Sequence, residues 1–324
     1  MGVRRDRRSA VADVRAHPYP DRVGGPVPVL PDPTRTGCVP TTSRRADRFR
    51  CAPDDDRHHE GRRRPVSQPP DAVPFRVPGR TSPAELRYVY LNLRDHPRGQ
   101  LQLAALVAAG FVPCLVVDED SPLAEAGRAG QLAELNQVAG YAEPEPTSEF
   151  CRRHGIAHRT VTDHNDETTV ELLRTARADL VALGDTRILK PHILALAPHG
   201  IVNVHPGYLP EVRGNHPYLW AVIHDLPQGV SVHLIDAEVD RGPLLRTRRV
   251  PIPDGIGLPD LVHLLNEECA TLLVETMRQI VDGTATLIPQ PGDARLTFRQ
   301  ARPEIRELAR TMLRERATAP VAGR

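Results

Sequence analysis

Asn203, His205 and Asp240 are the residues of this sequence whose types and spacing best suit chemistry. The first two stand at the end of the apolar run 201–204, and Asp240 follows the apolar run 229–235. An amide and an imidazole can stabilise the oxyanion that forms in acyl transfer, and a carboxylate can help to remove a proton from an attacking amine. A lone Asn-x-His pair is usually turn chemistry, so the case for catalysis depends on what surrounds it.

The elements that must position these residues alternate between short apolar runs and segments with helical spacing. The expected strands are 87–93, 111–117, 158–161, 179–183, 201–204, 229–235 and 244–250, and the expected helices are 100–109, 123–138, 147–154, 167–176, 189–196, 217–224 and 258–281. This alternation predicts an α/β fold with a Rossmann-like, doubly wound, mostly parallel sheet, in which ligands bind beyond the carboxyl ends of the strands. Ser231 and His233 alternate with apolar neighbours, which is typical of a half-exposed or edge strand.

The region before this sheet differs from it in composition. The first 80 residues hold 17 Arg and 13 of the 33 prolines and carry a net charge of +7, whereas the rest of the chain carries −6. Their apolar residues follow no period, so burial cannot offset the entropy of ordering. We expect a disordered Arg/Pro-rich leader over 1–81, a catalytic domain over 82–291 and a C-terminal extension with a partly helical tail over 292–324. Interrupting acids and missing aromatics argue against a nucleic-acid arm in the leader.

Several other classes of protein do not fit the sequence. The five cysteines are scattered and form no C-x-x-C pair, which argues against a disulfide framework and structural zinc. The histidines lack partners at ligand spacing, so no metal is expected. No apolar run is long enough for a signal peptide or a membrane span, which indicates a cytoplasmic protein without a membrane partner.

Four linked segments resemble the folate-dependent formyltransferase family. Segment 203–214 is similar to the family's Asn-x-His pair followed by a Leu-Pro-x-x-Arg/Lys-Gly loop. Segments 217–221, 229–233 and 239–245 then resemble, in order, its Trp-Ala helix, its Gly-Val-Thr-x-His strand and its Asp-Thr-Gly turn. The chain departs from the pattern at Gly207-Tyr208 and at Arg241, where the family commonly has Ser-Leu and Thr.

The resemblance implies the formyltransferase fold, 10-formyltetrahydrofolate as donor and a primary amine as acceptor. It implies that Asn203 hydrogen-bonds the formyl oxygen and that His205 shares this role and shuttles protons. Asp240 would orient His205 and accept the amine proton, directly or through water. The resemblance also implies a folate pocket that uses mostly backbone groups, formed on one side by Thr186, Arg187, Ile188 and Leu189 and on the other by Asp236, Ala237, Glu238 and Val239.

Other polar and aromatic residues near these motifs have simpler interpretations. Arg213 is expected to be a solvated loop residue with a structural role, and Trp220 a core residue. His216, His224 and His233 are expected to be a rim residue, a surface residue and a packed strand residue respectively.

The acceptor class is a further expectation. Methionyl-tRNA formyltransferases add a basic C-terminal domain, whereas residues 217–221 and the Asp163-x-Asn165 pair look more like enzymes that formylate amino sugars on nucleotide carriers. We therefore expect a small-molecule amine, with no nucleic acid as partner. A 10-formyltetrahydrofolate hydrolase and a non-catalytic folate- or nucleotide-binding module stay open as alternatives. The C-terminal strand and helix could provide the surface of a homodimer.

Overall fold

The computed structural model describes residues 71–291 and 297–318, with side chains described as far as residue 316. Most of the expected leader therefore lies outside the described residues. Residues 71–81 were expected to belong to that leader, but they are part of the fold. Strand β1 (Val73–Phe75) pairs antiparallel with β10 (Ala285–Leu287), and Val77 is only 2% exposed. This stretch orders because it does bury apolar surface, and because Arg80 binds Asp179 at 2.8 Å.

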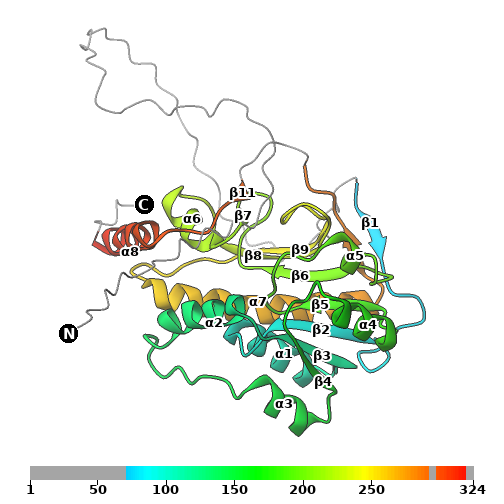
Figure 1. Cartoon of the computed structure of the whole chain (residues 1–324). Coiled ribbons are helices and arrows are strands. Elements are labelled where there is room, and N and C mark those ends of the chain that lie inside the picture. The colour runs from blue at the N-terminus through cyan, green and yellow to red at the C-terminus, as the bar shows by residue number, and fades with distance from the viewer. Residues whose placement is uncertain (1–70, 292–296, 319–324) are drawn as a thin grey trace, which may run out of the picture. The chain divides into compact units, whose positions relative to one another are not determined.

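A seven-stranded sheet forms the centre of the fold, in the order β4-β3-β2-β5-β6-β8-β9, as Figure 1 shows. Its strands, along the chain, are β2 (Tyr88–Leu93), β3 (Leu115–Glu119), β4 (His158–Val161), β5 (Leu180–Leu183), β6 (Ile201–His205), β8 (Gly229–Leu234) and β9 (Leu244–Arg249). The first five in the spatial order run parallel, and β8 pairs antiparallel with both of its neighbours, β6 and β9. The predicted mostly parallel, Rossmann-like sheet is confirmed.

Helices cover both faces of this sheet, because its parallel strands are apolar on both sides. The helices are α1 (Pro97–Ala108), α2 (Pro122–Leu135), α3 (Thr147–His154), α4 (Glu167–Ala176), α5 (Pro191–Leu194), α6 (Pro217–Ile223), α7 (Leu258–Val281) and α8 (Pro303–Thr318). One core cluster joins the sheet to α1, α6 and α7, and a second joins the opposite face to α4 and α5. Two short strands, β7 (Arg213–Gly214) and β11 (Thr297–Phe298), pair outside the main sheet.

Some element bounds differ from those expected. Helix α1 begins at Pro97 instead of residue 100, because proline is well suited to a first helical turn. The strand expected over 111–117 begins only at Leu115, since Gly110 and Pro113 occupy the connection that precedes it. The helix expected over 189–196 is only the four-residue α5.

Strand β8 is not the half-exposed or edge strand that its alternation suggested. It lies between β6 and β9, and five of its six residues are buried. Ser231 and His233 are both 0% exposed. Their polar groups are tolerated inside because each has hydrogen-bond partners in the neighbouring loops and strands.

Candidate active site

The candidate site lies on one face of the paired strands β6 and β8. The register places Asn203 opposite His233 and His205 opposite Ser231. Residues two apart on a strand share a face, and so do directly opposed residues, so all four side chains project on the same side of the sheet. Val202 and Val204 point the other way, into the core cluster that contains α7.

The loop after β6 folds back over His205. The Ser231 hydroxyl donates to the Gly207 carbonyl at 2.8 Å and accepts the Leu209 N–H at 2.9 Å. A side chain at position 207 would put its Cβ 2.6 Å from His205 Nε2, so only glycine fits there. This explains the departure from the family pattern at Gly207. The fold-back brings the Val212 carbonyl within 2.9 Å of His205 Nε2.

His205 is held as a neutral imidazole with a free lone pair on one defined nitrogen. A carbonyl oxygen only accepts, so Nε2 carries the hydrogen that is donated to Val212. Nδ1 faces Asp240 Oδ2 at 3.5 Å. Burial lowers the pKa of His205 below its ordinary value, and this outweighs the opposing effect of the Asp240 charge. The Nδ1 lone pair can therefore accept a proton beside a carboxylate that would stabilise the resulting cation.

Asp240 reaches this face from the loop between β8 and β9. Burial would raise the pKa of its carboxyl, but His205, His233 and the Gly214 N–H together hold that pKa well below its usual range. The Gly214 N–H donates to Oδ2 at 2.7 Å. Asp240 adopts a left-handed φ of 54°, a conformation that Asp tolerates better than most residues. The carboxyl group is therefore ionised at neutral pH.

His233, expected to be only a packed strand residue, is part of this constellation. Its Nδ1 donates to the Leu234 carbonyl at 3.0 Å, so its Nε2 accepts the Asn203 amide N–H at 3.1 Å. The same Nε2 lies 3.6 Å from Asp240 Oδ1. His233 therefore orients the amide of Asn203, which is half-buried. Sequence reasoning missed this role because it depends on the register between β6 and β8, which the sequence pattern does not reveal.

Arg213 and Gln290 form hydrogen bonds that support the loop carrying Asp240. Arg213 is 0% exposed and not the solvated residue expected, because its guanidinium donates to Gln290 Oε1 at 3.0 Å. The Gln290 amide in turn donates to the Asp240 and Gly242 carbonyls, at 2.9 and 2.8 Å. Nothing in the sequence near the motifs pointed to Gln290.

The loops of the expected folate pocket follow β5 and β8. In the first, Arg187 is committed to Glu119, at 2.7 Å from Nε to Oε2, and to Asp163. Ile188 is 54% exposed and Leu189 only 6%. In the second loop Asp236, Ala237 and Glu238 are exposed and Val239 is half-buried. In this loop Glu238 forms an ion pair with Arg241 at 3.1 Å. Arg241 stands where the family commonly has Thr.

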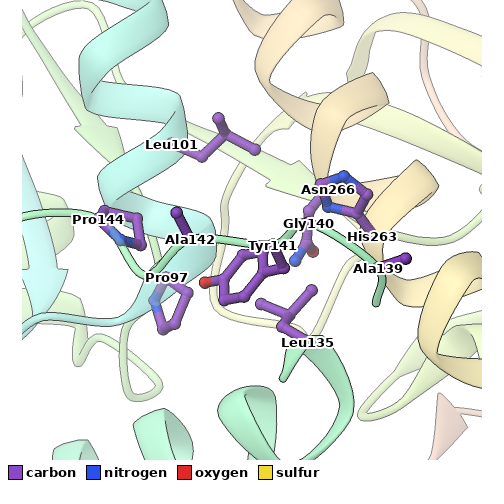
Figure 2. Close-up of a pocket in the computed structure, with 10 residues that line it drawn as sticks. All are labelled: Pro97, Leu101, Leu135, Ala139, Gly140, Tyr141, Ala142, Pro144, His263 and Asn266. Carbon is purple, nitrogen blue, oxygen red and sulfur yellow. The ribbon is translucent and has the colours of Figure 1, made fainter. Parts of the chain in front are cut away.

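A separate pocket of about 230 Å³ lies between α1, α2, α7 and the connection 139–144. Figure 2 shows Tyr141 among its lining residues, near Pro97 and Leu135. None of Asn203, His205 and Asp240 lines it. The chemistry proposed below is therefore argued from the β6–β8 face and not from this hollow. Within the described residues, no group of three or more His, Cys, Asp or Glu side chains could hold a metal ion.

Comparisons with known proteins found a matching family model and several similar proteins. A family model described as formyl transferase matches residues 129–276, a range that contains β6, β8 and the loop bearing Asp240. Over this range the chain matches the formyl transferase family, in line with the resemblance of its four motifs. Within the matched range the motif residues 203–214 form the end of β6 and the loop that folds over it.

Similar curated proteins include two methionyl-tRNA formyltransferases. That of Roseiflexus sp. is 37% identical over 216 residues, which are 66% of this chain and 62% of the relative. That of Agathobacter rectalis is 33% identical over 213 residues, 64% of this chain and 63% of the relative. The chain thus spans less than two thirds of the length of these relatives.

Solved structures of formyltransferases are also similar. Formyltransferase PseJ from Anoxybacillus kamchatkensis, solved with UDP-4,6-dideoxy-4-formamido-L-AltNAc and tetrahydrofolate, is 26% identical with a TM-score of 0.41, over 48% of this chain and 82% of that one. Phosphoribosylglycinamide formyltransferase from Streptococcus pneumoniae is 21% identical with a TM-score of 0.46, over 60% and 97% respectively. In the described part of the present chain, no helix is long and apolar enough to span a membrane.

We expect His96 to make the folded chain sensitive to acid. It precedes α1, is 2% exposed and lies 3.4 Å from Asp185 Oδ2. Burial lowers its pKa from 6.5 to about 4, despite the opposing charge of Asp185. Below pH 6.5 the unfolded chain binds the proton and the folded chain does not, so this residue alone costs up to about 3 kcal/mol of the free energy of unfolding as pH falls to 4.

Urea denaturation at pH 4.5 and pH 6.5 checks this prediction. The free energy of unfolding should be higher at pH 6.5, and His96→Leu should flatten the difference. A residual slope is expected, because burial and the nearby Arg306 charge also lower the pKa of His216 to about 4. An unchanged slope in His96→Leu would contradict the assignment.

Proposed function

We propose that this chain transfers the formyl group of 10-formyltetrahydrofolate to a primary amine of a small molecule. The observation that carries the proposal is the arrangement around His205: a neutral imidazole with its Nδ1 lone pair 3.5 Å from the buried carboxylate of Asp240. Beside it stands the amide of Asn203, oriented by His233. This combination supplies both a proton acceptor and an oxyanion donor.

The reaction follows from these positions. The unprotonated amine attacks the formyl carbon, a new C–N bond forms, and the carbonyl oxygen becomes an oxyanion to which the Asn203 amide donates. The proton lost by the amine passes to His205 Nδ1, and the charge of Asp240 stabilises the imidazolium. As the C–N bond to the folate breaks, that proton moves to the departing folate nitrogen. His205 is assigned as the proton acceptor because its Nδ1 lies 3.5 Å from the Asp240 carboxylate, whose charge would stabilise the imidazolium.

The donor is expected to lie against the two loops 186–189 and 236–239. Both offer backbone groups near the surface, while the Arg187 side chain is occupied by Glu119 and Asp163. A pterin carries several donors and acceptors on a flat ring, which suits recognition by backbone N–H and C=O groups.

Two observations bear on the acceptor. Residues 81–324 carry a net charge of −6, which disfavours a polyanion such as tRNA and supports a small amine, for instance an amino sugar on a nucleotide carrier. Against this, the curated relatives are methionyl-tRNA formyltransferases, which conflicts with the expectation of no nucleic-acid partner. Methionyl-tRNA is therefore the second candidate acceptor.

Absorbance-monitored release of tetrahydrofolate tests the proposal. The full chain is incubated with 10-formyltetrahydrofolate and, separately, nucleotide-linked amino sugars, small amines, methionyl-tRNA or no acceptor, with His205→Ala as the control. Release that depends on a small amine and is lost in the variant supports the proposal. Release only with methionyl-tRNA selects the second candidate, release without any acceptor indicates a hydrolase, and donor binding without turnover indicates a binding module.

A further inference from the structure

The segment Thr297–Ala301, here called the C-terminal strap, lies against the loop that carries the site. Its strand β11 pairs in parallel with β7, with Thr297 opposite Arg213 and Phe298 opposite Gly214. The Asn215 N–H donates to the Phe298 carbonyl at 3.0 Å. Residues far apart in the sequence are thereby joined directly beside Asp240.

Gly214 links the strap to the proposed catalytic carboxylate. Its N–H donates to Asp240 Oδ2 at 2.7 Å. A Cβ at this position would lie 2.0 Å from the Phe298 carbonyl oxygen, and the φ of Gly214 is 92°. The strap is therefore packed directly against the backbone whose N–H binds Asp240. A displacement of the strap has to change the position of that N–H.

Aromatic stacking and hydrogen bonds fasten the strap to α6. The ring of Phe298 stacks on Trp220, with centroids 5.1 Å apart and planes 14° apart, and also lies 5.3 Å from the His224 ring. Trp220 Nε1 donates to the Arg299 carbonyl at 3.0 Å, so Trp220 is a strap contact rather than the core residue expected. The Ala301 N–H donates to His216 Nδ1 at 3.1 Å.

Helix α8 anchors the other end of the strap. Arg306 and Arg310 bind the carboxylate of Glu134, at 2.6 and 2.7 Å, and Glu134 is only 2% exposed. Leu313 of α8 is buried in the core cluster that includes α6. Figure 1 draws β7, β11, α6 and α8 next to one another, as their contacts require. The strap is thus held by α6 and, through the chain that follows it, by α8.

From these contacts we infer that the C-terminal strap positions Asp240 for catalysis, with Phe298 as the positioning residue. The inference rests on the proposed function. Removing the Phe298 ring frees β11 from α6, so that β7 and the Gly214 N–H no longer hold the Asp240 carboxylate against His205. The expected effect is a fall in kcat of about 10-fold, less than the loss of a direct oxyanion donor, with the KM for 10-formyltetrahydrofolate unchanged.

The experiment uses the full chain with Phe298→Ala, the conservative Phe298→Tyr, and Leu308→Ala as a matched truncation at an exposed position of α8. Trp220 is the only tryptophan, so acrylamide quenching of its fluorescence reports directly whether the strap is released. The ring nitrogens of His205 are followed by NMR as a function of pH, and kcat and KM are measured over the same range.

Phe298→Ala should increase quenching of Trp220, shift the His205 titration and lower kcat, and Phe298→Tyr should restore all three. Leu308→Ala should leave both the quenching of Trp220 and the His205 titration at their wild-type values. The inference is overturned if Phe298→Ala exposes Trp220 while the His205 titration and the pH profile of kcat stay unchanged. If the wild-type chain turns over no acceptor, the proposed function fails, but fluorescence and NMR still decide whether the strap is coupled to His205.

Discussion

Replacing Asn203 by alanine is expected to lower kcat for formyl transfer by about 10²- to 10³-fold and to leave the KM for 10-formyltetrahydrofolate nearly unchanged. The amide donates to the formyl oxygen most strongly when that oxygen carries negative charge, so its loss raises the barrier more than it weakens binding. His233 holds the amide by accepting its N–H at 3.1 Å, so no reorganisation is needed during the reaction.

Stopped-flow or steady-state release of tetrahydrofolate measures this effect. Asn136→Ala is the matched control, because Asn136 is an exposed residue at the end of α2 and lies outside the proposed site. The control should retain wild-type kcat. A raised KM with unchanged kcat in Asn203→Ala would mean that Asn203 binds the donor and does not stabilise the oxyanion.

Replacing Asp240 by asparagine is expected to lower kcat by about 10²- to 10⁴-fold, the range typical of losing acid–base function. The variant keeps the size of the side chain and an oxygen that can accept the Gly214 N–H, so the fold should survive. What disappears is the negative charge 3.5 Å from His205 Nδ1. The imidazolium that forms during proton transfer then has no counter-charge in a buried position.

The pH dependence gives this prediction a second readout. The charge of Asp240 raises the pKa of His205 against the larger lowering effect of burial. Without that charge the pKa of His205 falls further, so the acid limb of the kcat profile should move to lower pH while the plateau drops. Asp254→Asn, at an exposed carboxylate in another loop, should show neither change. A lower plateau with an unmoved acid limb would show that His205 is not the group that titrates.

The expected helices and strands mostly appear in the structure because their signals are local. Strand β4 and helices α4 and α7 have the expected bounds, set by apolar periodicity and by adjacent caps such as Asp166, which accepts the Thr169 N–H. Bounds failed where neighbours decide them, as at α5. Asn203, His205 and Asp240 were also found from short motifs, and the fold brings them together.

The sequence by itself determined the fold class, the resemblance to the formyltransferase family and the three residues proposed for catalysis, because periodicity and short motifs are encoded within a few residues of chain. Only the tertiary structure decided that His233 orients Asn203, that Arg213 is buried on Gln290, and that β8 is an interior strand. The same holds for the contact of the strap with Gly214. Each of these depends on strand register or on pairing between distant segments, and hydrogen bonds between residues far apart in the chain leave no periodic trace in its sequence.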